Sequence, residues 1–321
     1  MNGARVESYR LFGLVLASDF PFVSHLSVGG GHPDLTFTCG DAPSIPDEPL
    51  PAPVYSSRLR TARGESNCTF YRLGGLDLLR FPEVGDFYLG ADRIVCRPAD
   101  LGDLGNVEIH LLGTALSCWL ESAGVPCLHA SAVVADGRTV GFLSHNGGGK
   151  SSLAAAMLEG GCALLTDDVL ALAPGPQGFI GRSGYPQMRL WPAEADRFCG
   201  PAANLPLVHR DFSKLRVPIG AGAFGSFDGG ERPLAAFYLP LRQEAAATVT
   251  IETLSPRDAL IELIRHSFLG SLVEAAGWQA RRLDLFARLA AEVPVKRLIY
   301  PSGLENLPRV RAAILNDLEG G

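Results

Sequence analysis

Residues 141–153 read GFLSHNGGGKSSL, an apolar stretch that leads into three glycines, a lysine and two serines. The order is close to G-x-x-x-x-G-K-[ST], the pattern of a phosphate-binding loop between a β-strand and an α-helix. Ser144 stands where that pattern has its first glycine, and we expect this substitution to reshape the start of the turn. The stretch therefore predicts a strand, a glycine loop and a helix, an arrangement typical of the α/β class.

The same stretch has the chemistry of a nucleotide site. Glycines let backbone N–H groups converge on phosphate oxygens, and the helix that follows adds its unpaired N–H donors. Lys150 can contact the β- and γ-phosphates, and the Ser151 hydroxyl can ligate Mg²⁺. We expect ATP and Mg²⁺ as cofactors; the alternative is a flexible hairpin before an ordinary helix. The predicted nucleotide-binding residues are Asn146, Gly147, Gly148, Gly149, Lys150, Ser151 and Ser152.

The segments around the loop fit this organisation. CLHASAVVA at 127–135, the turn DGR and TVGFLS predict a β-hairpin with an Asp-Gly turn. Residues 150–158 are rich in Ala and Leu and predict a helix that ends at Gly160 and Gly161. CALLTDDVLALAP at 162–174 predicts a buried strand interrupted by two acids.

These two acids, Asp167 and Asp168, are separated from the loop by a single predicted helix. We therefore expect both carboxylates beside the bound phosphates. One could hold Mg²⁺ and the other could accept a proton from an attacking hydroxyl. An acidic turn that caps the next segment is the structural alternative. His129, on the first strand of the hairpin, could reach the same pocket, although a lone histidine in an apolar strand is more often a core residue.

Two domains are predicted from the change of hydrophobic period along the chain. Residues 1–105 show short apolar stretches of period two between Gly, Pro and Asp turns, which indicates a β-rich N-terminal domain. From about residue 106 the period becomes helical, so a catalytic domain with a helical C-terminal region is expected over 106–321. The N-terminal domain could recognise the acceptor, make assembly contacts or cap the second domain.

Composition excludes several classes of function. The 321 residues carry a net charge of -6, which disfavours nucleic acid as a partner, and no apolar run approaches the roughly 20 residues that span a bilayer. The seven cysteines contain no C-x-x-C pair, and the N-terminal residues lack a long apolar segment. We therefore expect a cytoplasmic protein with no membrane partner.

His129, SHNGGGKS and LLTDD occur in an order and spacing that resemble the catalytic domain of the HPr serine kinase/phosphorylase family, over about residues 106–200. The resemblance implies a P-loop kinase domain of the HPr kinase/PEP carboxykinase type. It implies that Asp167 is the base on a serine hydroxyl, that His129 assists Asp167, and that Lys150 serves ATP. Ser151 and Asp168 would then hold the metal. Related kinases are hexamers, so a homo-oligomer is expected.

One segment departs from that family. The Glu-x-Arg-Gly-Leu-Gly segment of HPr kinases is replaced by GYPQMRLWPAEA at 184–195. The chain looks more like the HPr-kinase-related proteins of lasso-peptide biosynthesis, some of which phosphorylate a C-terminal serine of the precursor peptide. Arg189 is then a candidate substrate contact, with a surface arginine beside a packed Trp191 as the alternative, and Glu194 is a candidate second metal contact.

The resulting hypothesis is an ATP- and Mg²⁺-dependent kinase whose partner is a peptide or small protein that carries a serine. Two alternatives stay open at this point. The acceptor could be HPr or another folded protein, or the chain could be a nucleotide-binding regulator without catalysis.

Overall fold

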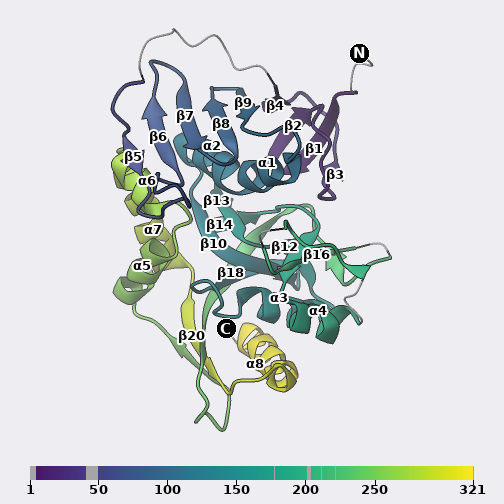
Figure 1. Cartoon of the computed structure of the whole chain (residues 1–321). Helices are drawn as coiled ribbons and strands as arrows, with labels where there is room; N and C mark the ends of the chain where they lie inside the picture. The colour runs from purple at the N-terminus through teal and green to yellow at the C-terminus, as the bar shows by residue number, and fades with distance from the viewer. Residues whose placement is uncertain are drawn as a thin grey trace. The chain divides into compact units, whose positions relative to one another are not determined.

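The computed structural model describes residues 5–40, 50–176, 178–200, 204–210, 212–220 and 222–320. The protein is of mixed α/β type and forms two compact units (Figure 1). The first unit comprises Met1–Gly124 and Leu269–Ala280, and the second comprises Val125–Phe268 and Arg281–Gly321. Among the described residues, no helix has the length and apolar character needed to cross a membrane.

In the described part of the first unit, nine strands form one sheet in the order β3-β1-β2-β4-β9-β8-β7-β6-β5. The pairs β2–β4 and β4–β9 are parallel and the others are antiparallel. The period-two stretches predicted from the sequence therefore form one mixed sheet. Its strands are β1 (Glu7–Leu11), β2 (Leu14–Ser18), β3 (Ser27–Val28), β4 (Leu35–Cys39), β5 (Tyr55–Ser56), β6 (Thr69–Arg72), β7 (Asp77–Phe81), β8 (Gly85–Leu89) and β9 (Arg93–Pro98).

The helical run after this sheet consists of α1 (Leu104–His110), a π-helical turn η1 (Leu111–Ala115) and α2 (Leu116–Ser122). It belongs to the first unit, where the Trp119 indole donates to the carbonyl of Gly90 at 2.9 Å. The second unit thus begins at Val125 and not near residue 106. The change of period marks the start of a helix, whereas the packing partner of that helix decides which unit it joins.

The first unit also takes a segment from far along the chain. Helix α6 (Gly270–Ala275) contacts β5, and Arg72 donates to the carbonyl of Ala276 at 2.6 Å. No local pattern in the sequence predicts this return, because it depends on contacts about 200 residues apart.

The second unit is built on a mixed sheet whose described strands run in the order β17-β12-β10-β13-β14-β18-β20-β19, with β11 paired to β10 and β18. Strands β15 and β16 form a separate two-stranded sheet. The strands are β10 (Cys127–Ala135), β11 (Arg138–Leu143), β12 (Ala163–Thr166), β13 (Val169–Gly175), β14 (Gly178–Arg182), β15 (Gln187–Leu190), β16 (Leu215–Pro218), β17 (Ser226–Phe227), β18 (Glu231–Arg242), β19 (Thr250–Thr253) and β20 (Val295–Tyr300).

The local predictions for this unit are confirmed. β10 and β11 form the antiparallel hairpin, and the two acids divide the next strand into β12 and β13, which both pair with β10. In addition to the predicted features, Ser255 caps helix α5 (Pro256–Arg265) by accepting from the Asp258 N–H at 3.2 Å. The helices are α3 (Lys150–Glu159), α4 (Pro192–Cys199), α5 (Pro256–Arg265), α7 (Gln279–Glu292), η3 (Leu304–Asn306) and α8 (Leu307–Glu319).

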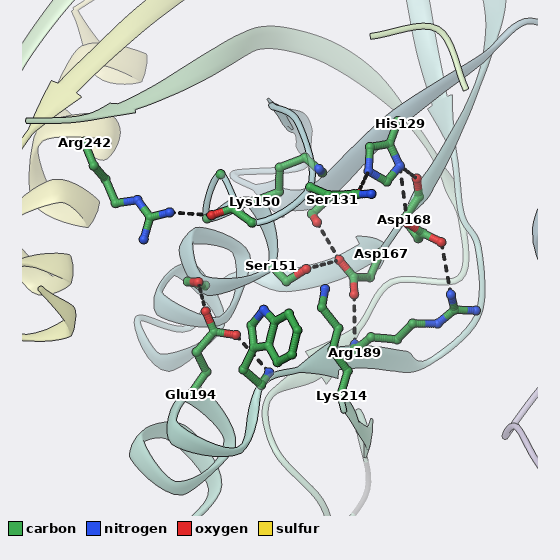
Figure 2. A pocket seen from close by; sticks show the side chains of 16 residues that line it. His129, Ser131, Lys150, Ser151, Asp167, Asp168, Arg189, Glu194, Lys214 and Arg242 are labelled. Atoms are coloured by element: carbon green, nitrogen blue, oxygen red, sulfur yellow. Dashed lines mark hydrogen bonds and ion pairs between the residues drawn. The ribbon is translucent and has the colours of Figure 1, made fainter. Parts of the chain in front are cut away.

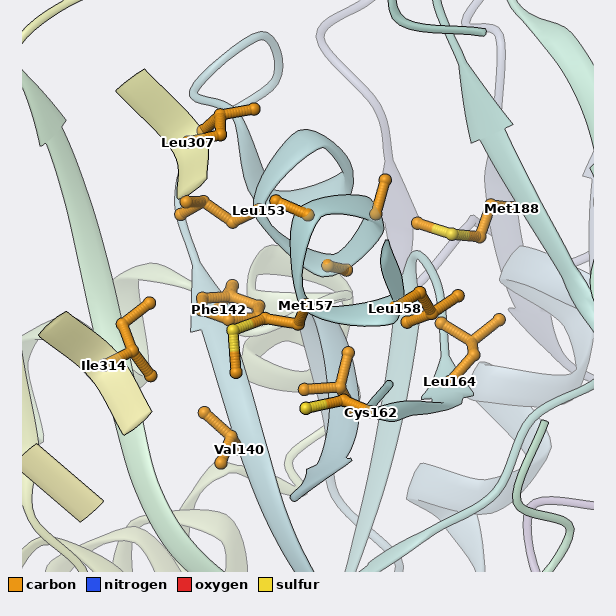
Figure 3. Close-up of a cluster of buried hydrophobic side chains, with 14 of the residues drawn as sticks. Val140, Phe142, Leu153, Met157, Leu158, Cys162, Leu164, Met188, Leu307 and Ile314 are labelled. Carbon is orange, nitrogen blue, oxygen red and sulfur yellow. The ribbon is translucent and has the colours of Figure 1, made fainter. Parts of the chain in front are cut away.

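Helix α3 is buried along most of its length, which anchors the end of the glycine loop. Its apolar side chains pack between the sheet and α8 in one cluster (Figure 3). Because interiors are close-packed, α3 cannot shift without disturbing this cluster, so Lys150 at its first position is held in place. Members of the cluster include Val140, Phe142, Leu153, Met157, Leu158, Leu164, Leu307 and Ile314.

A matched pair of helical isoleucines tests this core. Ile314→Ala in α8 removes a side chain that is 0% exposed and should lower the free energy of unfolding by about 2–5 kcal/mol. Ile261→Ala in α5, where the side chain is 42% exposed, should cost less than about 1 kcal/mol. Chemical denaturation of both variants measures the difference, and equal costs would contradict the proposed core.

Candidate active site

The residues predicted for nucleotide, metal, catalysis and substrate all line one pocket of the second unit (Figure 2). Its volume is about 210 Å³. The pocket lies where the loop after β11, the start of α3, the break between β12 and β13 and the end of β15 come together. Residues that are separate in the sequence are therefore neighbours here.

The glycine loop has left-handed backbone at Gly147 (φ 78°) and Gly149 (φ 94°), which favours glycine at both positions. Ser144 does not have a positive φ, so its backbone at the start of the turn is compatible with a serine. Instead, the side chain of Ser144 occupies the space next to Gly148, where a Cβ would collide with it. The serine at 144 and the glycine at 148 are thus a matched pair.

Lys150 is 7% exposed and folds back over the loop. Its ammonium donates to the carbonyls of Ser144 at 2.7 Å and His145 at 3.4 Å. Burial lowers its pKa to about 8, although Asp168 and Asp167 act in the opposite direction. No carboxylate in the described ranges forms an ion pair with this ammonium, so an anionic ligand would offset the cost of burying the charge.

Asp167 is buried and accepts three hydrogen bonds. The hydroxyls of Ser131 and Ser151 donate to Oδ1 at 2.5 and 3.0 Å, and the backbone N–H of Arg189 donates to Oδ2 at 2.9 Å. This carboxylate is therefore held in one orientation, beside the serine that the loop pattern assigns to Mg²⁺.

Asp168 has a left-handed backbone, with φ of 83°, and its carboxylate faces other partners. Oδ1 lies 3.3 Å from His129 Nδ1, and Arg189 Nη1 donates to Oδ2 at 3.1 Å. Burial alone would raise the pKa of Asp168, but the positive charges of Arg189 and His129 hold it below its usual value. Burial lowers the pKa of His129, while Asp168 acts in the opposite direction; the other ring nitrogen of His129, Nε2, lies 3.0 Å from Asn146 Oδ1.

The partners of the two acids are exchanged relative to the sequence-based expectation. Ser151, the expected metal ligand, contacts Asp167, while His129 contacts Asp168. Consecutive side chains of a regular strand point to opposite faces, and the left-handed φ of Asp168 interrupts this alternation, so that both carboxylates line the same pocket. A left-handed aspartate is uncommon and is often found at functional sites.

Arg189 and Glu194 have structural partners in the pocket. The Arg189 guanidinium contacts Asp168 and, at 3.4 Å, the hydroxyl of Tyr185. Glu194 accepts from the Ser152 hydroxyl and, at 3.0 Å, from the Trp191 N–H, so it caps the start of α4. The substrate role of Arg189 and the metal role of Glu194 stay predictions, and Trp191 is 45% exposed instead of packed.

Three further residues, which the sequence patterns did not predict as site residues, line the pocket. Ser131 follows His129 by two positions on β10 and shares its face, so strand alternation could have identified it. Arg242, at the end of β18, donates to the carbonyl of Gly147, and Lys214 precedes β16. Neither of these two has a local sequence signal, because each reaches the pocket through sheet pairing.

The residues present fit Mg²⁺ and a nucleotide. Mg²⁺ prefers oxygen ligands and usually shares them with phosphate and water; Asp167 and Ser151 provide two such oxygens side by side. In the described part of the chain, no three His, Cys, Asp or Glu side chains cluster as a metal site of their own. The glycine loop and Lys150 offer N–H donors and one buried cation to phosphate.

Comparison with known proteins gives one solved structure of interest. No family model matches the chain, and no curated protein matches its sequence. The HPr(Ser) kinase/phosphatase from Coxiella burnetii is similar to 60% of this chain and 97% of its own chain, with 16% identity and a TM-score of 0.31.

The lowered pKa of Lys150 is testable by amine labelling. Acetylation requires the neutral amine, so the labelling rate of Lys150 should rise with a midpoint near pH 8, well below the usual 10.5. Mass spectrometry of the peptide that contains Lys150 measures this midpoint. Adding ATP and Mg²⁺ should slow the labelling, since phosphate charge favours the ammonium. A midpoint at or above 10.5 without nucleotide would contradict the burial effect.

Proposed function

We propose that this protein is an ATP- and Mg²⁺-dependent phosphotransferase that phosphorylates a serine hydroxyl. The observation that carries the proposal is the division of the pocket: a glycine loop with a buried lysine on one side, and two carboxylates with different partners on the other. Phosphoryl transfer depends mainly on positioning and charge neutralisation, and this arrangement supplies both.

Each residue has a task in the proposed reaction. The loop N–H groups and Lys150 bind the phosphates, and Asp167 and Ser151 hold Mg²⁺, which neutralises phosphate charge when bound. Asp168 orients the attacking hydroxyl and accepts its proton. Because the pKa of Asp168 is held low, this carboxylate is ionised at neutral pH and acts mainly by orientation. Arg189 and His129 keep it in place.

The acceptor we propose is a peptide, in particular a lasso-peptide precursor. The support is the motif resemblance together with the segment 184–195, which replaces the HPr-kinase segment and forms β15 and the start of α4 beside the pocket. A role of the first unit in acceptor recognition or in assembly stays a prediction. A homo-oligomeric state also stays a prediction.

Mass spectrometry of acceptors after incubation with ATP and Mg²⁺ tests the function. We expect a mass increase of one phosphate on a precursor peptide that ends in serine, none on its Ser→Ala counterpart, and none with Lys150→Ala protein. Phosphorylation of HPr in place of the peptide would change the substrate but keep the enzyme class. Binding of ATP without transfer to any hydroxyl would favour a regulator and contradict the proposal.

Substitution of the two aspartates should have different effects on turnover and on nucleotide binding. Asp168→Asn should lower kcat by about a hundredfold or more, the range for loss of a proton-accepting group, with little effect on Mg²⁺-dependent ATP binding. Asp167→Asn should weaken that binding, because it removes an expected Mg²⁺ ligand. Asp228→Asn, which breaks an ion pair with Arg232 outside the pocket, serves as the control. The opposite pattern of binding and turnover would return the base role to Asp167.

A further inference from the structure

Lys214 reaches the pocket from the end of a two-stranded sheet. In the antiparallel pair β15–β16, Leu190 is opposite Leu215, so the next residues outward, Trp191 and Lys214, face each other. The backbone of Lys214 is held from the other side as well, since its carbonyl accepts from the Val208 N–H at 2.9 Å. The backbone of Lys214 is thus anchored at the end of this sheet.

The ring of Trp191 supports the Lys214 ammonium. Nζ lies 5.8 Å from the ring centroid, within the range of a cation–π contact. Trp191 is the N-cap residue of α4, and Glu194 in the first turn accepts from its N–H. Figure 2 shows the Lys214 side chain directed into the space that Ser151 and Asp167 also face.

The charge of Lys214 helps to lower the pKa of Asp168, but the two side chains do not form an ion pair in the part of the chain that the structure describes. Among the described residues, no carboxylate forms an ion pair with Lys214, whereas Lys296 lies 2.7 Å from Asp317. The chain has three lysines, and two of them line this pocket. Burial is the main cause of the lowered pKa of Lys150, and the charge of Lys214 contributes to the same lowering. The pocket carboxylates Asp167 and Asp168 offset part of the repulsion between the two lysines, and a ligand with several negative charges would offset more of it.

We propose that Lys214 is a second phosphate-binding cation, which contacts the terminal phosphoryl group of the nucleotide from the side opposite the glycine loop. The inference rests on the proposed function. In the transfer, the bond from the γ-phosphorus to the bridging oxygen of ADP breaks and its electron pair leaves with ADP. The serine Oγ bonds to phosphorus and its proton passes to Asp168. Lys214 stays protonated and neutralises charge on the moving group, and Trp191 is its positioning residue.

Equilibrium binding of nucleotides tests this role without turnover. Isothermal titration calorimetry compares ADP with the non-hydrolysable triphosphate AMP-PNP, both with Mg²⁺. Lys214→Met should weaken AMP-PNP binding about tenfold, the size expected for one charge-assisted hydrogen bond, and change ADP binding by less than about twofold. Lys214→Arg should retain most of the affinity. Lys296→Met, which removes the same charge outside the pocket, should leave the AMP-PNP to ADP ratio unchanged.

Variants of Trp191 test whether its ring positions the Lys214 ammonium. Trp191→Phe keeps an aromatic face and should keep the AMP-PNP preference, whereas Trp191→Leu should lose part of it. An unchanged AMP-PNP to ADP ratio in Lys214→Met would overturn the inference. So would a Lys214→Met protein whose only defect is a higher KM for the acceptor, which would assign the lysine to the acceptor.

Failure of the proposed function gives a different result. In that case the wild-type protein transfers phosphate to no hydroxyl, yet Lys214→Met still loses its preference for the triphosphate. The assignment of Lys214 to the terminal phosphate would then stand as a property of nucleotide binding.

Discussion

The break between β12 and β13 decides where the charged groups of the pocket point. Thr166 donates to the carbonyl of Val169 at 2.6 Å across the break, and the carbonyl of Asp168 still accepts from the Ala130 N–H at 3.2 Å. The strand therefore keeps its pairing with β10 while one residue takes a left-handed backbone. The two consecutive carboxylates line the same pocket and contact two different sets of partners.

The pocket differs in charge from the rest of the chain. Four cationic side chains, Lys150, Arg189, Lys214 and Arg242, line it against three carboxylates, Asp167, Asp168 and Glu194, in a protein of net charge -6. Such a local excess of positive charge attracts an anionic ligand and makes its bound state more favourable. The cations stand on elements that are far apart in sequence, so a bound triphosphate would connect the loop, β15, β16 and β18.

Rigidity in the pocket comes from the elements that carry its side chains. Helix α3 is packed in the core behind Lys150, while Asp167 is fixed by two hydroxyls and one backbone N–H. Asp168 is fixed by an imidazole and a guanidinium. Preorganised dipoles and charges need no rearrangement when a reaction begins, which is why such an arrangement suits phosphoryl transfer.

The sequence by itself determined the strand, loop and helix around GGGKS, the hairpin before them and the interruption of the next strand by two acids. These features depend on neighbouring residues: glycine freedom, helix propensity and hydrophobic period. Only the tertiary structure decided that Asp167 contacts Ser151 and Asp168 contacts His129, because these partners lie on two other elements, α3 and β10. It also decided that Lys214 and Arg242 enter the pocket and that α1, α2 and α6 belong to the first unit, because strand pairing and helix packing join residues that are distant in the chain.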